Sequence, residues 1–310
     1  MSADAREDKP GRVTRLLRVD LPVADLSRAA AFYHDGLGFV MEGGERRDAS
    51  CRWLTMRLGA QAIRLVRYHS QGRAYPGGGA SADLWFQHIA LVVSDMPRAF
   101  QRVSAQPGFQ PISRGGPQRL PANTGSVTAF KFRDPDGHPL ELIYFPQGAA
   151  AEAWRRPSDD LFLGYDHSAI CVSNLEQSLR FYTKVLGLRN ASHSLNRGPE
   201  QARLDGLIDP VVDVNGLAPA RQPTPHIELL CYHVVRGAPR PPPEPADIAG
   251  AQLVLEADDC AKIAARLKDA GHPFAWPQPE PDEQSVGRIL MRDPDGHLIA
   301  LAQPPVANPG

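Results

Sequence analysis

The sequence lacks the features that mark several protein classes. Its 310 residues include only four cysteines, and no two of them form a CxxC pair, which argues against a zinc knuckle or a disulfide framework. No apolar run approaches the roughly 20 residues needed to span a membrane. The polar N-terminus does not resemble a signal peptide. Basic and acidic residues, 34 and 35 of them, nearly cancel, so no basic surplus is available for nucleic acid or an anionic membrane. We predict a cytoplasmic protein with no nucleic-acid or membrane partner.

The composition is that of a globular protein with loops rich in glycine and proline. Hydrophobic residues make up 42% of the chain, and 310 residues correspond to roughly two domains. The 27 glycines and 30 prolines cluster in three internal stretches. A further stretch, 147–160, separates two apolar segments and is the predicted linker between two halves.

Two short motifs each occur twice, in the same order. FYxxxLG stands at 32–38 and again at 181–187, and RDPDGH stands at 133–138 and again at 292–297. The first motif is early and the second late in each half, which predicts a tandem repeat of about 150 residues.

Each half divides again into two similar modules. Four segments begin with an apolar strand, continue into an N-capped helix and end in short strands; the opening strands start near Leu16, His88, His167 and Gln252. In the third module, Ser173 and Glu176 fit a capping box. We therefore predict two tandem domains, 14–146 and 161–303, with tails at 1–13 and 304–310.

This arrangement resembles the vicinal oxygen chelate superfamily, which includes glyoxalase I, epimerases, bleomycin resistance proteins and extradiol dioxygenases. The resemblance rests on the four-fold βαβββ pattern, the FYxxxLG motif after each half's first strand, and the DPDGHPLEL sequence entering a final strand. It implies an α+β fold in which four βαβββ modules form curved mixed β-sheets around a cavity. It does not by itself select an activity, because one scaffold serves many reactions.

The resemblance also implies where a metal would bind, because family ligands come from the first and last strands of paired modules. Modules two and three carry His88, Glu141, His167 and Glu228 at these positions. Two imidazoles and two carboxylates suit Ni, Zn, Co, Mn or Fe(II). We predict one divalent metal per chain, held by these four residues.

Modules one and four differ at the matching positions. They carry Arg18, Arg64, Ala251 and Ala300, which do not hold a cation. This difference predicts that modules two and three pair with each other around the metal, and that modules one and four pair without one. Whether Arg18 and Arg64 form an anion site is left open.

Four further residues have weaker signals. His226 and Tyr232 alternate with Glu228 along one strand and so share its face, which makes them candidate substrate contacts. His138 and His297 lie in the RDPDGH turns and are interpreted as turn residues.

Three functions remain open, and each involves a small molecule. We expect the protein to be a monomer or a homodimer. The first is a glyoxalase I-like lyase, isomerase or epimerase that transfers a proton next to a metal-bound carbonyl or enediolate oxygen, with Glu141 or Glu228 as base. The second is an extradiol Fe(II) dioxygenase, against which the second carboxylate counts. The third is a binding or resistance protein without catalysis. A glutathione substrate would need basic residues; Arg197, Arg203 and Arg221 are the candidates.

Overall fold

The computed structural model describes residues 11–146, 152–155, 158–234, 241–272 and 287–303. Most of the predicted N-terminal tail, all of the C-terminal tail from 304 to 310, and residues 147–151 and 156–157 of the predicted linker lie outside the described residues. Within the described part, no helix is long and apolar enough to cross a membrane.

The first half of the chain contains two modules. Module one consists of β1 (Val13–Pro22), α1 (Leu26–Ala31) continuing as the π-turn η1 (Phe32–Gly36), β2 (Val40–Arg47), β3 (Cys51–Leu58) and β4 (Gln61–Tyr68). Module two consists of β5 (Gln87–Val93), α2 (Met96–Ser104), β6 (Gln110–Pro111), β7 (Gln118–Arg119), η2 (Ala122–Thr124), β8 (Thr128–Arg133) and β9 (Pro139–Tyr144).

The second half repeats the plan after the short turn η3 (Glu152–Trp154). Module three consists of β10 (Phe162–Cys171), α3 (Leu175–Arg180) continuing as η4 (Phe181–Val185), β11 (Arg189–Arg197), α4 (Pro199–Asp205), β12 (Val211–Ala218) and β13 (His226–Tyr232). Module four consists of β14 (Gln252–Ala257), α5 (Cys260–Asp269), β15 (Gly287–Arg292) and β16 (Leu298–Gln303).

The start of α3 differs from the predicted capping box. Asn174 is the N-cap, and its side chain accepts a hydrogen bond from the Gln177 backbone N–H at 3.0 Å. Ser173 lies one residue earlier, where its own N–H donates to Asp295 at 2.9 Å. The capping-box prediction is therefore wrong by one position, because Asn competes well with Ser for this role.

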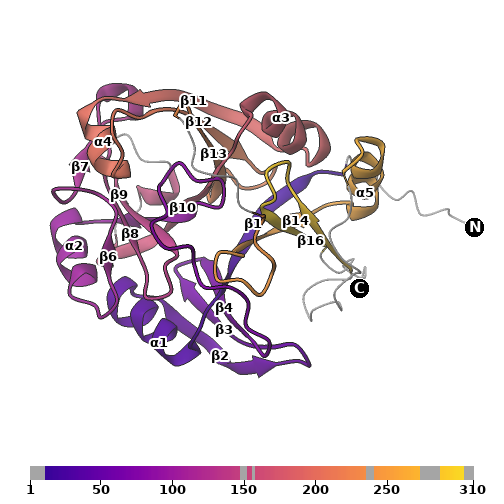
Figure 1. The fold of residues 1–310 in the computed structure, drawn as a ribbon, viewed down its shortest axis with the longest axis horizontal. Coiled ribbons are helices and arrows are strands. Elements are labelled where there is room, and N and C mark those ends of the chain that lie inside the picture. The colour runs from indigo at the N-terminus through magenta and orange to yellow at the C-terminus, as the bar shows by residue number, and fades with distance from the viewer. Residues whose placement is uncertain (1–10, 147–151, 156–157, 235–240, 273–286, 304–310) are drawn as a thin grey trace, which may run out of the picture.

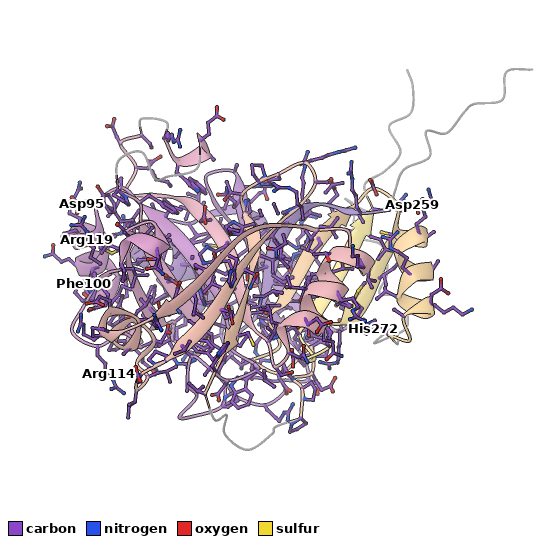
Figure 2. All side chains as sticks on the ribbon, turned by 90° about the horizontal axis from the view of Figure 1, so that it is seen from above. Asp95, Phe100, Arg114, Arg119, Asp259 and His272 are labelled. Atoms are coloured by element: carbon purple, nitrogen blue, oxygen red, sulfur yellow. The ribbon has the colours of Figure 1, made fainter. Side chains whose placement is uncertain are left out.

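The strands form two mixed sheets, each of which combines modules from both halves. One sheet has the order β15-β16-β14-β1-β4-β3-β2; the other has the order β11-β12-β13-β10-β5-β9-β8-β6, with β7 also pairing β8. β5 and β10 join modules two and three, and β1 and β14 join modules one and four, both antiparallel. This is the predicted pairing. The helices lie at the periphery (Figure 1), with α2 and α5 at opposite ends of the molecule, marked by Phe100 and Asp259 in Figure 2.

The repeated motifs meet between the two sheets. The Tyr33 hydroxyl donates to Asp134 at 3.1 Å, and the Tyr182 hydroxyl donates to Asp293 at 3.0 Å. Both tyrosines are fully buried. Each FYxxxLG motif therefore contacts the RDPDGH turn of the other module in its half, and these contacts join one sheet to the other.

Candidate metal centre

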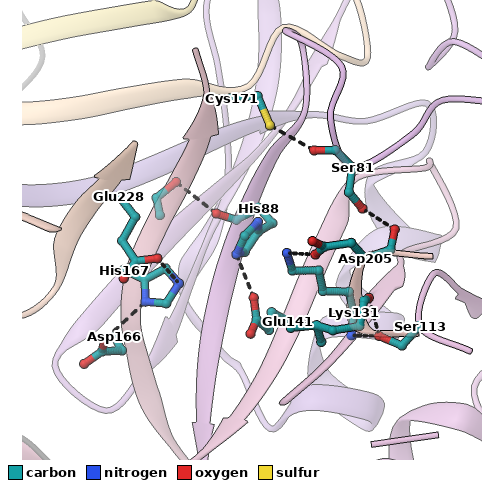
Figure 3. A network of polar contacts seen from close by, with 12 residues as sticks. Ser81, His88, Ser113, Lys131, Glu141, Asp166, His167, Cys171, Asp205 and Glu228 are labelled. Carbon is teal, nitrogen blue, oxygen red and sulfur yellow. Dashed lines mark hydrogen bonds and ion pairs between the residues drawn. The ribbon is translucent and has the colours of Figure 1, made fainter. Parts of the chain in front are cut away.

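Four strands at the centre of the nine-stranded sheet carry the four predicted ligands. His88 lies on β5 and His167 on the neighbouring β10, while Glu141 lies on β9 beside β5 and Glu228 on β13 beside β10 (Figure 3). Ala90 pairs with both Glu141 and His167, and Ala169 pairs with both Glu228 and His88. The register therefore repeats the same relation in both modules and brings residues up to 140 positions apart into one site.

Three of the four side chains form a compact group. The candidate ligand atoms of His88, Glu141 and His167 all lie within 4.8 Å of one another, and all three side chains are buried. His88 Nε2 is 2.8 Å from Glu141 Oε2, and the His88 and His167 ring centroids are 5.7 Å apart. Glu228 lies at the border of this group, with Oε2 3.4 Å from His167 Nε2 and a side chain that is 20% exposed.

The His88 ring supports metal binding. Both ring nitrogens are buried without a hydrogen-bond partner in the described chain. The short Nε2–Glu141 approach is a close contact without hydrogen-bond geometry, so the distance alone does not satisfy the nitrogen. A buried nitrogen left unpaired costs about 1–3 kcal/mol, and coordination of a divalent ion would remove that cost. The residues present therefore fit a metal ion.

The charges around the group agree with this fit. Burial lowers the pKa of His88 despite the nearby Glu141, so the imidazole is neutral and its lone pair is available. Burial opposes ionisation of Glu141, but His88 and Lys131 outweigh it and lower the Glu141 pKa to about 2. Burial also lowers the pKa of His167, yet Glu228 and Asp166 raise it to about 9. Two carboxylates thus attract positive charge to this position.

Asp166 belongs to the site, although sequence reasoning missed it. On a regular strand it would point away from its neighbour His167, but β10 has a register shift between Tyr165 and His167, with Asp166 as the extra residue. Its Oδ2 lies 3.2 Å from His167 Nδ1, and Trp154 Nε1 donates to its Oδ1 at 2.7 Å. Asp166 therefore orients His167 with Nε2 toward the site. No sequence signal indicated the bulge.

His226 and Tyr232 both lie on β13 beside Glu228, as predicted, but in different surroundings. His226 packs against the acidic groups, with Nε2 3.5 Å from Glu228 and Nδ1 3.8 Å from Asp166. Tyr232 is buried and lines a cavity in front of the site. Their contact with a substrate stays a prediction.

The cavity has a volume of about 290 Å³ and is lined by residues of modules two and three. His88, Glu141, His167 and Glu228 lie on its wall. A larger hollow of about 750 Å³ beside α2 shares no lining residue with it, and Asp95, its one carboxylate, caps α2. The four candidate ligands therefore face the smaller cavity and not the larger one.

Lys131 is a second residue that sequence reasoning missed. It lies on β8 directly opposite Glu141 and lines the cavity. Its Nζ is 2.7 Å from Asp205, whose other oxygen accepts a hydrogen bond from Gln201 at 2.7 Å. Burial opposes the charge on Lys131, but Asp205 and Glu141 raise its pKa, so the lysine stays charged. No signal in the sequence indicated this pair, because Lys131 is a single lysine in an apolar strand and Asp205 belongs to another module.

The seven-stranded sheet has different residues at the equivalent positions. Arg18 is the equivalent of His167, because it pairs with Val254 of β14 as His167 pairs with Ala90 of β5. Arg64 is the equivalent of Glu228, because it pairs with Asp20 of β1 as Glu228 pairs with Ala169 of β10. Asp20 also pairs with Gln252, which makes Gln252 the equivalent of His88.

The assignment of Ala251 to that position is therefore wrong by one residue, because only the register across β1 and β14 locates the start of the strand. Ala300 remains equivalent to Glu141, since both lie opposite the matching residue of the first strand. Arg18 forms a buried ion pair with Asp20 at 2.7 Å. A guanidinium at this position disfavours a divalent cation.

Comparison with known proteins supports the fold and the repeat. A family model described as Glyoxalase/Bleomycin resistance protein/Dioxygenase superfamily matches residues 15–142 and 164–301. Similar solved structures include a variant of glyoxalase I from Zea mays, with TM-score 0.65 and 18% identity over 94% of this chain and 92% of that one. Another is a putative dioxygenase from Bacillus subtilis, with TM-score 0.59 and 14% identity over 95% and 86%. These likenesses show a shared fold.

Characterised relatives match parts of the chain. It is 27% identical over 178 residues to lactoylglutathione lyase GLX1 of Arabidopsis thaliana, covering 56% of this chain and 55% of the relative, so the match spans about half of that protein. It is 27% identical over 164 residues to 2-epi-5-epi-valiolone epimerase of Actinomyces sp, covering 46% and 85%. It is 29% identical over 133 residues to lactoylglutathione lyase of Salmonella typhimurium, covering 42% and 91%.

Proposed function

The chain belongs to the Glyoxalase/Bleomycin resistance protein/Dioxygenase superfamily, and we propose that it is a metal-dependent enzyme that transfers a proton at the carbon next to a carbonyl group. The observation that carries the proposal is the compact group of His88, Glu141 and His167 with a second carboxylate, Glu228, beside it. A lyase and an epimerase among the relatives agree with this reaction type.

His88, Glu141 and His167 are the proposed ligands of one divalent ion, which is Ni, Zn, Co, Mn or Fe(II). When bound, the ion would polarise the carbonyl oxygen of a substrate and so acidify the neighbouring C–H bond. Asp166 holds His167 by its other ring nitrogen, which keeps Nε2 directed at the site.

Glu228 is the proposed base. It lies outside the compact group, faces the cavity, and is partly exposed to it. His226 and His167 lower its pKa against the effect of burial, so it is ionised and can accept a proton. The proton moves from carbon to Glu228 while the C–H electron pair forms a C–C double bond and the carbonyl π pair moves to oxygen. Return of the proton to the opposite face or to the neighbouring carbon gives an epimer or an isomer without net oxidation.

Substitution of each glutamate separates these two roles. We expect Glu141→Gln to lose metal, and Glu228→Gln to retain metal but to lose about 10²-fold or more of its rate of deuterium exchange from D₂O into a carbonyl substrate. His88→Ala should retain metal at least about 10-fold more weakly. Equal loss of metal in Glu141→Gln and Glu228→Gln would argue that both are ligands and that the base lies elsewhere.

A second candidate function is ring cleavage by an Fe(II) dioxygenase. The specific observation in its favour is that the compact group contains two imidazoles and one carboxylate, the donor set of such enzymes. Protein reconstituted anaerobically with Fe(II) should then consume O₂ when a catechol is added. Oxygen uptake that survives Glu228→Gln would favour this function over proton transfer.

A further inference from the structure

The cavity in front of the candidate metal centre has a mixed wall of apolar side chains, acidic and neutral polar groups, histidines and one lysine. Glu141, Asp166 and Glu228 contribute three carboxylates to its wall. The ammonium group of Lys131 also faces it but lies 2.7 Å from the fully buried carboxylate of Asp205, which neutralises its charge. Anionic ligands are normally held by unpaired arginine or lysine groups. A bound divalent ion would offset two of the three carboxylate charges, so the described wall still has no surplus of positive charge for a ligand with several carboxylates.

The arginines considered as clamps for a glutathione carboxylate do not alter this balance. Arg203 donates to Gln118 at 2.6 Å and lies 3.4 Å from Glu200. Arg197, Arg203 and Arg221 are not among the residues lining the cavity in the described chain.

One buried carboxamide lacks a partner and lies on the cavity wall. Asn196 is 9% exposed, and its Oδ1 has no hydrogen-bond partner among the described residues. A buried amide group left unpaired in this way is unfavourable, and a hydrogen bond to a ligand hydroxyl would remove that penalty. Which of the two amide atoms faces the ligand depends on the flip of the group, and a hydroxyl can pair with either one.

Asn196 belongs to a belt of neutral hydrogen-bonding side chains. Ser192 and Ser194 precede it on β11, and Asn123 and Thr124 lie on the facing turn η2, all lining the cavity. Asn123 Nδ2 donates to the Leu195 carbonyl at 3.2 Å, which ties the two segments together. The cavity volume of about 290 Å³ lies just below the usual range of about 300–1,000 Å³ for small-molecule sites, which favours a small ligand.

We propose that the substrate is a small, uncharged, hydroxyl-rich carbonyl compound whose carbonyl end faces His88, Glu141 and His167 and whose hydroxyl groups contact Asn196. This inference rests on the proposed function, since it names the substrate class of the same site. The cavity selects such a compound because neutral donors and acceptors match its hydroxyl groups, while the carboxylates on the wall repel an anion.

The test compares three probes on the metal-loaded full chain. They are 2-keto-myo-inositol, which is an uncharged polyhydroxy ketone, 3-dehydroquinate, which is a cyclic hydroxyketone with a carboxylate, and the hemithioacetal of methylglyoxal with glutathione. Calorimetry measures binding, and NMR in D₂O measures exchange of the proton next to the carbonyl. We expect 2-keto-myo-inositol to bind at least about 10-fold more tightly than both anionic probes and to exchange its proton.

The outcomes distinguish the two levels of the proposal. Preferred binding and exchange of either anionic probe overturns the substrate class and leaves the proposed proton transfer intact. Binding of 2-keto-myo-inositol without exchange, by contrast, supports the substrate class and counts against the proposed function. Failure of all three probes to bind overturns the substrate class.

A pair of variants tests Asn196 itself. Asn196→Leu should weaken 2-keto-myo-inositol binding about 10-fold, the effect of roughly 1.4 kcal/mol. Asn190→Leu on the same strand is the matched control, because Asn190 is exposed and absent from the cavity wall. Its affinity should stay within about twofold of the parent protein. If Asn196→Leu and Asn190→Leu bind 2-keto-myo-inositol with the same affinity and both keep the circular dichroism of the parent protein, Asn196 does not contact the substrate.

Discussion

At the scale of single residues, the site depends on polar groups that are costly to bury and are compensated by other groups of the chain. Lys131 is paired with Asp205, His167 is paired with Asp166, and the ring nitrogens of His88 have no hydrogen-bond partner among the described residues, which leaves them to the proposed metal ion. Each compensation involves a residue from a distant part of the sequence or from an irregular strand. Substitutions at these residues should therefore have large effects of predictable sign.

Lys131→Met should destabilise the protein by about 3–5 kcal/mol, because it leaves the buried Asp205 carboxylate unpaired. The double substitution Lys131→Met and Asp205→Asn should recover part of this loss, since it removes both charges. Urea unfolding measures both values. Arg180→Met breaks the exposed ion pair with Glu176 and is the control, with a change near zero. A Lys131→Met variant as stable as the parent would refute the structural role of the pair.

His138 should make stability depend on pH. Burial lowers its pKa, but Asp134 at 2.9 Å outweighs burial and raises it above the ordinary value of 6.5. Because the pKa of His138 is higher in the folded than in the unfolded protein, protonation of His138 stabilises the folded state. This stabilisation is complete below about pH 6.5 and is lost as pH rises through the folded-state pKa. The difference in unfolding free energy between the parent and His138→Gln should therefore shrink from pH 6 to pH 9. A difference that stays constant over this pH range would contradict this assignment.

At the scale of elements, strand register decides which side chains meet. The bulge in β10 turns Asp166 toward His167, and the π-turns η1 and η4 place Tyr33 and Tyr182 against the RDPDGH turns. His138 and His297 are buried in these turns, where their Nε2 atoms lie 2.9 and 2.8 Å from the carbonyls of Ile248 and Cys171. The repeated motifs thus serve the contact between sheets, and the candidate metal ligands lie in strands β5, β9, β10 and β13.

Asp166→Asn should weaken metal binding by about 10–100-fold, because the weaker hydrogen bond no longer fixes the His167 ring. Competition with a chelator measures the affinity, and circular dichroism checks that the fold persists. Asp159→Asn, at an exposed position before β10, is the control and should bind metal like the parent. Unchanged affinity in Asp166→Asn would show that the Asp166 carboxylate does not contribute to metal binding.

At the scale of the whole molecule, the tandem repeat forms two sheets that carry different residues at equivalent positions. The nine-stranded sheet carries two histidines and two glutamates at the paired positions, and the seven-stranded sheet carries two arginines, a glutamine and an alanine. Because each half contributes to both sheets, neither half contains the complete candidate site.

One metal ion per chain is the expected stoichiometry. Elemental analysis of the purified, metal-saturated protein should give a ratio near one, and dialysis against a chelator should remove the ion from His88→Ala at a chelator concentration that leaves it in the parent protein. The reason is that the Arg18–Asp20 ion pair occupies the equivalent of the His167 position in the other sheet. Two ions per chain, or an ion that His88→Ala holds against the chelator as firmly as the parent protein does, would contradict the assignment.

The sequence by itself determined the repeat and the module plan, because local patterning and a doubled motif are properties of the chain alone, and the family resemblance carried by these motifs implied His88, Glu141, His167 and Glu228 as candidate ligands. It also predicted the pairing of modules two and three, since charge at matched positions separates a cation site from an arginine pair. Only the tertiary structure decided that Asp166 turns toward His167, that Asp205 neutralises Lys131, and that Gln252 rather than Ala251 is equivalent to His88. Those three outcomes depend on strand register and on a bulge, which are set by packing between segments far apart in the chain.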